Sequence, residues 1–256
     1  MRFLLIHGGF HGAWCWRDVI PQIERLGHEA VAIDLPGHGK RREQRSMLAD
    51  RRDAIVSAMQ PGDVLVGHSG GGFDITLAAD AAPEKVGHLV YLAAGVPIEG
   101  RPLVEATGGA KGGNGDVNGE IDRLNRSIPS SALRPTPQGR LEWVDKDLAR
   151  QIFYHDCDEQ LVDWAFAQFS PAPPEILVEP VTIPRFWAAA LPRSYIICLQ
   201  DRALSYAESV AFAGRLGVIP LFIEGSHSPF LSRPAELAAL LLKATATQPV
   251  AALQSF

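Results

Sequence analysis

The chain has 256 residues, of which 46% are hydrophobic and 21% charged, and its formal net charge is -5. This is the composition of a globular domain and excludes an intrinsically disordered chain. The length suits one domain with a single core, with or without an inserted subdomain. The negative charge, together with the lack of any basic run longer than residues 40–42, predicts that nucleic acid is not a partner.

The cysteines and the N-terminal residues bear on cellular location. Cys15, Cys157 and Cys198 are too few and odd in number for a disulfide framework, so we expect reduced thiols and a cytoplasmic protein. The apolar run at residues 3–6 is too short for a secretory signal, and no run of about 18 apolar residues occurs. We therefore expect neither export nor membrane insertion.

Short apolar runs alternate with longer stretches of helical periodicity in the first hundred residues. Continuous apolar runs suit strands that are buried on both faces, as in a parallel sheet between two layers of helices. The expected strands are residues 3–6, 30–33, 64–66 and 89–92, and the expected helices are residues 15–26, 46–59 and 70–81. This alternation predicts a doubly wound α/β sheet.

The alternation stops near residue 97 and resumes near residue 195. Residues 108–119 are rich in glycine and predict a mobile loop, whereas the apolar spacing of residues 146–169 predicts one helix, ended by the prolines that follow. The elements expected after this stretch are strands at 195–199 and 218–223, a helix at 234–243 and a frayed tail at 245–256. We therefore expect a core of residues 1–96 and 191–256, with about six mostly parallel strands, and a helical cap or lid at residues 97–190.

Residues 67–71, Gly-His-Ser-Gly-Gly, match the pattern Gly-x-Ser-x-Gly between an expected strand and an expected helix. In this context the pattern indicates a nucleophile elbow, a sharp turn that presents the serine above the carboxyl edge of the sheet. Gly67 and Gly71 lack a Cβ atom and so allow strand and helix to approach closely. Ser69 is the predicted nucleophile; the alternative is an incidental serine in a glycine-rich turn.

A serine hydroxyl needs a base, and the base needs an acid that orients it. In a site built on such an elbow the chain order is serine, acid, histidine. Asp201 follows one expected strand and His227 follows the next, so both fall at the carboxyl edge of the sheet. We predict Asp201 as the acid and His227 as the base. The alternative for Asp201 is a cap of the helix starting near Ser205, and the alternative for His227 is an ordinary loop histidine.

Acyl transfer also needs N–H donors for the oxyanion. The glycine turn after the first expected strand offers Gly9 or Phe10, and Gly70 follows the nucleophile, so we predict these as the oxyanion hole. The alternatives are a plain tight turn and a phosphate-binding loop. The glycine spacing, however, fits neither the Walker motif nor the dinucleotide-binding motif.

Apolar side chains near the elbow and in the cap are candidates for a substrate pocket, since such pockets are mostly hydrophobic. Plain packing inside the cap would explain the aromatic ones equally well. The pocket candidates are His68, Phe153, Trp164, Phe169 and Trp187. The spacing of histidines and cysteines shows no metal-ligand pattern, and we expect neither a metal nor another cofactor.

Four ordered motifs, at residues 7–16, 67–71, 199–202 and 225–228, resemble the plant methylesterase and hydroxynitrile lyase branch of the α/β hydrolases, and bacterial pyrethroid-hydrolase-like esterases. The resemblance covers residues 2–95 and 190–243 and extends only loosely to the cap. It implies the α/β-hydrolase fold, the same triad and oxyanion groups, and an apolar pocket under a lid.

The resemblance also helps to choose between esterase and lyase. The lyases of this branch carry threonine at the position of Gly8 and lysine at that of Ser228, and both serve cyanohydrin chemistry. Their absence favours hydrolysis of small to medium apolar carboxylic esters through an acyl-enzyme. The serine nucleophile also disfavours epoxide hydrolase and dehalogenase chemistry, which in this fold uses aspartate. A carbon–carbon lyase of the hydroxynitrile lyase type and a hydrolase-like ligand receptor remain as alternatives, and a homodimer stays open.

Overall fold

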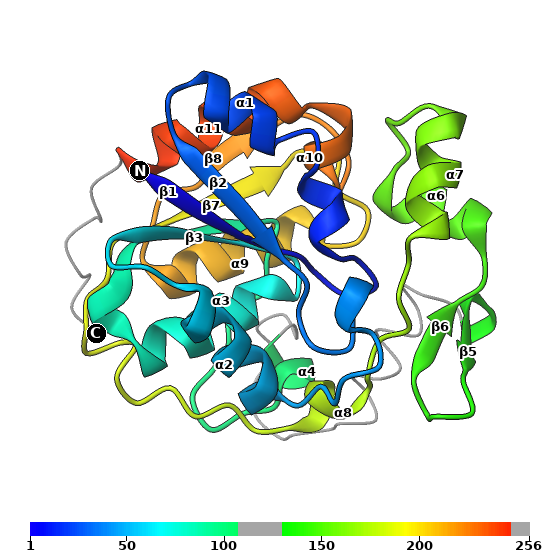
Figure 1. The fold of residues 1–256 in the computed structure, drawn as a ribbon, viewed down its shortest axis with the longest axis horizontal. Helices are drawn as coiled ribbons and strands as arrows, with labels where there is room; N and C mark the ends of the chain where they lie inside the picture. Colours follow the sequence, from blue (N-terminus) through cyan, green and yellow to red (C-terminus); the bar gives the residue numbers. More distant parts are fainter. Residues whose placement is uncertain (107–129, 247–256) are drawn as a thin grey trace.

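The structure, a computed structural model, describes residues 1–106 and 130–246 (Figure 1). The glycine-rich stretch predicted as a mobile loop, residues 108–119, lies outside the described residues, as does the predicted tail from residue 247 onward. None of the helices in the described ranges combines the length and the apolar character needed to span a bilayer. The three cysteines are buried and form no disulfide, and the cytoplasmic location inferred from them remains a prediction.

Six parallel strands form the central sheet, in the order β2-β1-β3-β4-β7-β8. They are β1 (Arg2–Ile6), β2 (Glu29–Ile33), β3 (Asp63–His68), β4 (Val86–Leu92), β7 (Arg193–Cys198) and β8 (Leu221–Ile223). The chain leaves β1 toward β2 on one side and then returns to add β3 on the other side. The loops after β1 and β3 therefore diverge, and the carboxyl ends of these two strands form the switch point where open α/β sheets bind ligands.

Helices cover both faces of this sheet (Figure 1). On one face lie α1 (Ile20–Arg25) and α11 (Pro234–Thr245), and on the other lie α2 (Leu48–Ala58), α3 (Gly71–Ala81) and α9 (Tyr206–Leu216). Strand β3 shows why its sequence is apolar without alternation: Val64 and Val66 pack into the first layer, Leu65 packs into the second, and all three are buried. The predicted doubly wound sheet of about six strands is confirmed.

The segment between β4 and β7 holds short elements that pack at different places. These are α4 (Leu103–Ala106), the hairpin of β5 (Leu133–Pro135) and β6 (Leu141–Trp143), α6 (Lys146–Phe153), α7 (Glu159–Ala167) and α8 (Glu175–Val178). The hairpin, α6 and α7 stand together beside the sheet, whereas α4 and α8 contact each other elsewhere (Figure 1). Farther along, Val181, Ile183 and Phe186 pack in the same hydrophobic cluster as α3 and α9.

The prediction of one helix over residues 146–169 is wrong, because α6 ends at Phe153 and α7 begins at Glu159. The carboxylate of Asp158 accepts the N–H of Leu161 at 2.8 Å and caps the new helix. Between the helices, Tyr154 and Cys157 are buried. The apolar spacing continues across the break and hides it in the sequence.

A buried ion pair between α2 and α3 gives a test of this packing. Arg51 donates two hydrogen bonds, of 2.7 and 2.6 Å, to the carboxylate of Asp74, and both side chains are at most 3% exposed. Because Arg51→Ala leaves the Asp74 charge buried without a partner, we expect the free energy of unfolding to fall by about 3–5 kcal/mol in urea denaturation. The neighbouring Arg52→Ala breaks an exposed pair with Asp53 and should change it by less than about 0.5 kcal/mol. Equal losses in the two variants would contradict this account.

Candidate active site

Ser69 lies in the sharp turn between β3 and α3 with a φ of 54°, in the left-handed region that non-glycine residues rarely adopt. A Cβ on Gly67 would lie 2.6 Å from the Gly71 carbonyl oxygen, so strand and helix meet more closely than any side chain allows. The Ser69 N–H donates to the Leu92 carbonyl at 3.2 Å, and its own carbonyl accepts from the Gly95 N–H at 3.0 Å. The glycine contact and these backbone bonds hold the strained turn in place.

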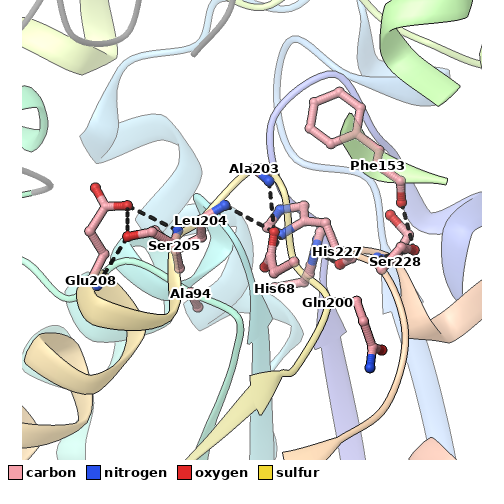
Figure 2. A network of polar contacts seen from close by, with 12 residues as sticks. His68, Ala94, Phe153, Gln200, Ala203, Leu204, Ser205, Glu208, His227 and Ser228 are labelled. Carbon is pink, nitrogen blue, oxygen red and sulfur yellow. Dashed lines mark hydrogen bonds and ion pairs between the residues drawn. The ribbon is translucent and has the colours of Figure 1, made fainter. Parts of the chain in front are cut away.

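His227 and Asp201 are directly bonded at the carboxyl ends of β8 and β7. His227 Nδ1 donates to Asp201 Oδ2 at 2.7 Å, and both side chains are at most 3% exposed. The other carboxylate oxygen accepts the N–H groups of Ala203 and Leu204 at 2.8 and 2.9 Å (Figure 2). Because Nδ1 carries the proton toward the carboxylate, Nε2 of a neutral His227 has a lone pair free to accept one.

The alternative role of Asp201, as the cap of the following helix, belongs to another residue in the structure. Helix α9 is capped by Ser205, whose hydroxyl accepts the N–H of Glu208, while the Glu208 carboxylate accepts the N–H of Ser205 (Figure 2). Asp201 lies before this capping box and faces the imidazole instead.

His68 joins the nucleophile turn to the histidine loop. Its Nε2 donates to the backbone carbonyl of His227 at 2.9 Å, and the two imidazole rings are 4.6 Å apart (Figure 2). The ring is fully buried, and this burial holds the pKa of His68 well below its usual value. Among the described residues the hydroxyl of Ser69 has no hydrogen-bond partner, so the Ser69–His227 bond is not formed in this structure.

The predicted oxyanion donors face one another across the two turns. A Cβ on Gly8 would lie 2.7 Å from the Ser69 Cβ, and one on Gly70 would lie 3.7 Å from the Gly9 nitrogen. Within the part of the chain that the structure describes, the N–H groups of Gly9, Phe10 and Gly70 have no hydrogen-bond partner. Phe10 has a φ of 64°, so this turn, like the elbow, contains a residue in the left-handed region.

Two buried histidines hold the carbonyl groups of the first turn, and sequence reasoning assigned them no role. His7 Nδ1 donates to the Gly8 carbonyl at 2.8 Å, while its Nε2 accepts the N–H of Leu35 at 3.1 Å. His11 Nδ1 donates to the Gly9 carbonyl, also at 2.8 Å. Since a trans peptide is planar, a fixed carbonyl sets the direction of the N–H in the same plane. His7 therefore orients the Gly9 N–H.

Of the predicted pocket residues, Phe153 and Phe169 lie at the site and Trp187 does not. The Phe153 ring is 5.8 Å from His227, and Phe169 stacks on Phe10 at 6.1 Å. Trp164 packs edge-on against Trp14 at 5.3 Å, one aromatic layer farther from His227.

Trp187 contacts Phe186 and Arg193, the first residue of β7, and so lies toward the amino edge of the sheet. Trp143, which the sequence did not single out, lies 5.1 Å from Phe153 and 5.4 Å from Phe10. The hairpin that carries Trp143 was not predicted, so nothing in the sequence placed it near the elbow. No cluster of three or more metal-ligand side chains occurs in residues 1–106 and 130–246.

Comparison with known proteins places this architecture in a family. The sequence matches the alpha/beta hydrolase family over residues 3–240. The chain belongs to the α/β hydrolases. Among curated proteins, this α/β hydrolase is 27% identical to norfluorocurarine synthase 1 of a Strychnos species, with 92% of both chains covered. It is 26% identical to methyl jasmonate esterase 1 of Vitis vinifera, covering 94% of this chain and 95% of the relative.

Solved structures show the same fold. An extracellular α/β-hydrolase from a Paenibacillus species matches with a TM-score of 0.75 at 22% identity, covering 96% of this chain and all of the other. A pyrethroid hydrolase from Sphingobium faniae matches with a TM-score of 0.70 at 23% identity, covering 96% of this chain and 97% of the other. The predicted α/β-hydrolase fold and the resemblance to methylesterases and pyrethroid hydrolases are confirmed.

The buried histidines of the first turn predict a loss of stability in mild acid. Burial lowers the pKa of His7 to about 4 and that of His11 to about 3, whereas both titrate near 6.5 in an unfolded chain. As the pH falls from about 6.5 toward 4, the unfolded chain binds protons that the folded chain excludes, so stability present above pH 6.5 is lost. We expect the free energy of unfolding, measured in urea, to fall by about 1.4 kcal/mol per pH unit for each histidine.

The control for this titration is His11→Phe, which removes one of the histidines whose pKa is lowered by burial. Between pH 6.5 and 5, the unfolding of this variant should take up about one proton fewer than that of the wild type, so the slope of its unfolding free energy against pH should be smaller. A wild-type plot that stays flat over this window would contradict the neutral state of both imidazoles.

Proposed function

We propose that this α/β hydrolase is a carboxylic ester hydrolase, with Ser69 as nucleophile, His227 as base and Asp201 as the orienting acid. The observation that carries the proposal is the 2.7 Å bond from His227 to the buried Asp201 carboxylate, beside a serine held at positive φ. Relatives named as methylesterase, methyl jasmonate esterase and pyrethroid hydrolase support an ester as substrate.

The reaction proceeds in two steps. Ser69 Oγ attacks the ester carbonyl carbon while His227 Nε2 takes the hydroxyl proton, and the Asp201 carboxylate stabilises the resulting imidazolium. The carbonyl oxygen becomes negative and accepts from Gly70 N–H and from Gly9 or Phe10 N–H. His227 then returns the proton to the departing alcohol, which leaves an acyl-enzyme.

Water completes the cycle by the same path. His227 removes a proton from the water as it attacks the acyl carbon, and Ser69 leaves with that proton as the acid is released. The Ser69 hydroxyl has no competing partner among the described residues, so rotation about its Cα–Cβ bond is free to bring it toward His227. Catalytic hydrogen bonds of this kind often tighten only in the substrate complex. No step requires a cofactor.

The side chains around His227 favour apolar esters of small to medium size. Phe10, Phe153 and Phe169 form an aromatic wall next to the imidazole and offer no charged group. We propose that the hairpin β5–β6 with α6 and α7, all within residues 97–190, forms the lid of this pocket, over a core of residues 1–96 and 191–256.

Two residues favour hydrolysis over cyanohydrin cleavage. Any side chain at position 8 would start 2.7 Å from the Ser69 Cβ, so the threonine of the related lyases requires the elbow or the turn to shift. Ser228, at the position of their lysine, is buried and uncharged. We expect rapid hydrolysis of p-nitrophenyl butyrate and no cyanide release from mandelonitrile. Cyanide release would instead support the lyase, and binding of esters without turnover would support the receptor.

The nucleophile is tested by Ser69→Ala. Because the variant keeps the Cβ and loses only the hydroxyl, we expect kcat for p-nitrophenyl esters to fall by a factor on the order of 10³ to 10⁶ with an unchanged circular dichroism spectrum. Ser57→Ala, which changes an exposed hydroxyl on α2, is the matched control and should keep full activity. Undiminished hydrolysis by Ser69→Ala, in a preparation free of host esterases, would defeat the assignment. Esters of increasing acyl length, assayed with the wild type, then define the substrate range.

A further inference from the structure

The turn between α6 and α7 contacts three of the four loops that carry the proposed site, namely those after β1, β7 and β8. We call residues 153–156 the connecting turn. The Tyr154 hydroxyl donates to His11 Nε2 at 2.6 Å, and His155 Nε2 donates to the Gln200 carbonyl at 2.9 Å. The Phe153 carbonyl accepts from the Ser226 hydroxyl at 2.9 Å, next to His227 (Figure 2). The connecting turn thus touches the loops after β1, β7 and β8, which explains why the helix breaks here.

We infer that Tyr154 is a positioning residue for ester hydrolysis: through His11 it holds the Gly9–Phe10 peptide so that the Phe10 N–H faces the oxyanion. This inference rests on the proposed function. It extends that function by giving one lid residue a part in transition-state stabilisation, acting through another side chain and without touching the substrate.

Two hydrogen bonds connect Tyr154 to Gly9 through His11, with Tyr154 as the first donor and the Gly9 carbonyl as the last acceptor. Burial raises the pKa of the Tyr154 phenol well above its usual value, so the phenol is a neutral donor. Burial also lowers the pKa of His11 to about 3, so near neutral pH its Nε2 accepts and its Nδ1–H donates. Nδ1 has one acceptor, the Gly9 carbonyl at 2.8 Å. The tyrosine hydroxyl therefore fixes the tautomer that holds this carbonyl.

The Gly9–Phe10 peptide needs such support because Phe10 has a positive φ. The Phe10 carbonyl accepts the N–H of Ser170, just beyond α7, at 2.8 Å. The Gly9 carbonyl, which belongs to the Gly9–Phe10 peptide itself, accepts from His11 Nδ1. Without these bonds the strained residue is free to relax toward negative φ, which would turn its N–H away. Ser170 lies in the segment between β4 and β7, and so does Tyr154, which acts through His11. The proposed lid therefore takes part in the chemistry and does more than cover it.

An N–H that meets the developing oxyanion stabilises the transition state more than the bound ester. Loss of its orientation therefore lowers kcat and leaves KM nearly unchanged. A general loosening of the lid would act differently, because a poorer apolar pocket raises KM. A fall in kcat with an unchanged KM therefore indicates a positioning role, whereas a rise in KM indicates a structural one.

The test is a double-mutant cycle with Tyr154→Phe and His11→Phe, assayed with p-nitrophenyl butyrate. We expect Tyr154→Phe to lower kcat about tenfold, as for a weakened oxyanion donor, with KM changed less than about twofold. His11→Phe should lower kcat at least as much, and the double variant should be no slower than His11→Phe alone. Tyr91→Phe is the matched control: it removes an equally buried hydroxyl, bonded to Thr76 at 2.7 Å in the other hydrophobic cluster, and should keep kcat.

A second readout does not depend on turnover. In the wild type the ¹⁵N shifts of the His11 ring should show a protonated Nδ1 and an unprotonated Nε2, and Tyr154→Phe should move these shifts and the Phe10 amide signal. Tyr91→Phe should move neither.

The inference is overturned if the two losses in kcat multiply in the double variant, if KM rises while kcat holds, or if the Phe10 signal is unmoved. A wild-type chain that hydrolyses no ester overturns the proposed function, and this inference with it. Failure of the cycle in an active wild type overturns this inference alone.

Discussion

The site depends on the close approach of two backbone turns, which only glycine permits. A Cβ on Gly71 would lie 2.7 Å from the His7 carbonyl oxygen, and one on Gly8 would lie equally close to the Ser69 Cβ. These contacts press the turn after β1 against the elbow after β3, at the switch point of the sheet. For this reason the Ser69 side chain lies beside the turn after β1, and Gly70 lies beside the Gly9 nitrogen.

Three buried, neutral imidazoles hold backbone carbonyl groups in and around the site. His7, His11 and His68 are buried, and each donates one N–H to a backbone carbonyl at 2.8 to 2.9 Å. Burial removes water from these imidazoles and so disfavours their charged form, which is the main reason why their pKa values are lowered. His227 differs from the three, because its N–H donates to the carboxylate of Asp201. A carboxylate stabilises an imidazolium, so among these four histidines His227 has the partner that suits the proposed base.

The sequence allowed the core of the fold and its carboxyl edge to be predicted, because local patterns determine both. The strands are buried on two faces and read as unbroken apolar runs, and the elbow requires glycines at fixed spacing around Ser69. Asp201 and His227 were predicted to lie at the same edge because each follows a strand, and the structure brings these two side chains into contact. The break after Phe153 was not found, because apolar spacing continues through it and the contacts that favour it are distant in the chain. Tyr154 and His11 are separated by 143 positions, and no periodicity links them.

The connecting turn has a consequence for engineering and for divergence within such enzymes. Because Tyr154 and Ser170 contact the turn after β1, we expect that the proposed lid of this chain cannot be replaced as an independent module. A replacement lid would have to supply a hydroxyl for His11 and an N–H for the Phe10 carbonyl, or the enzyme would lose rate while still binding its substrate. Changes in substrate preference are therefore expected in α6 and α7, while the connecting turn that joins these helices stays fixed.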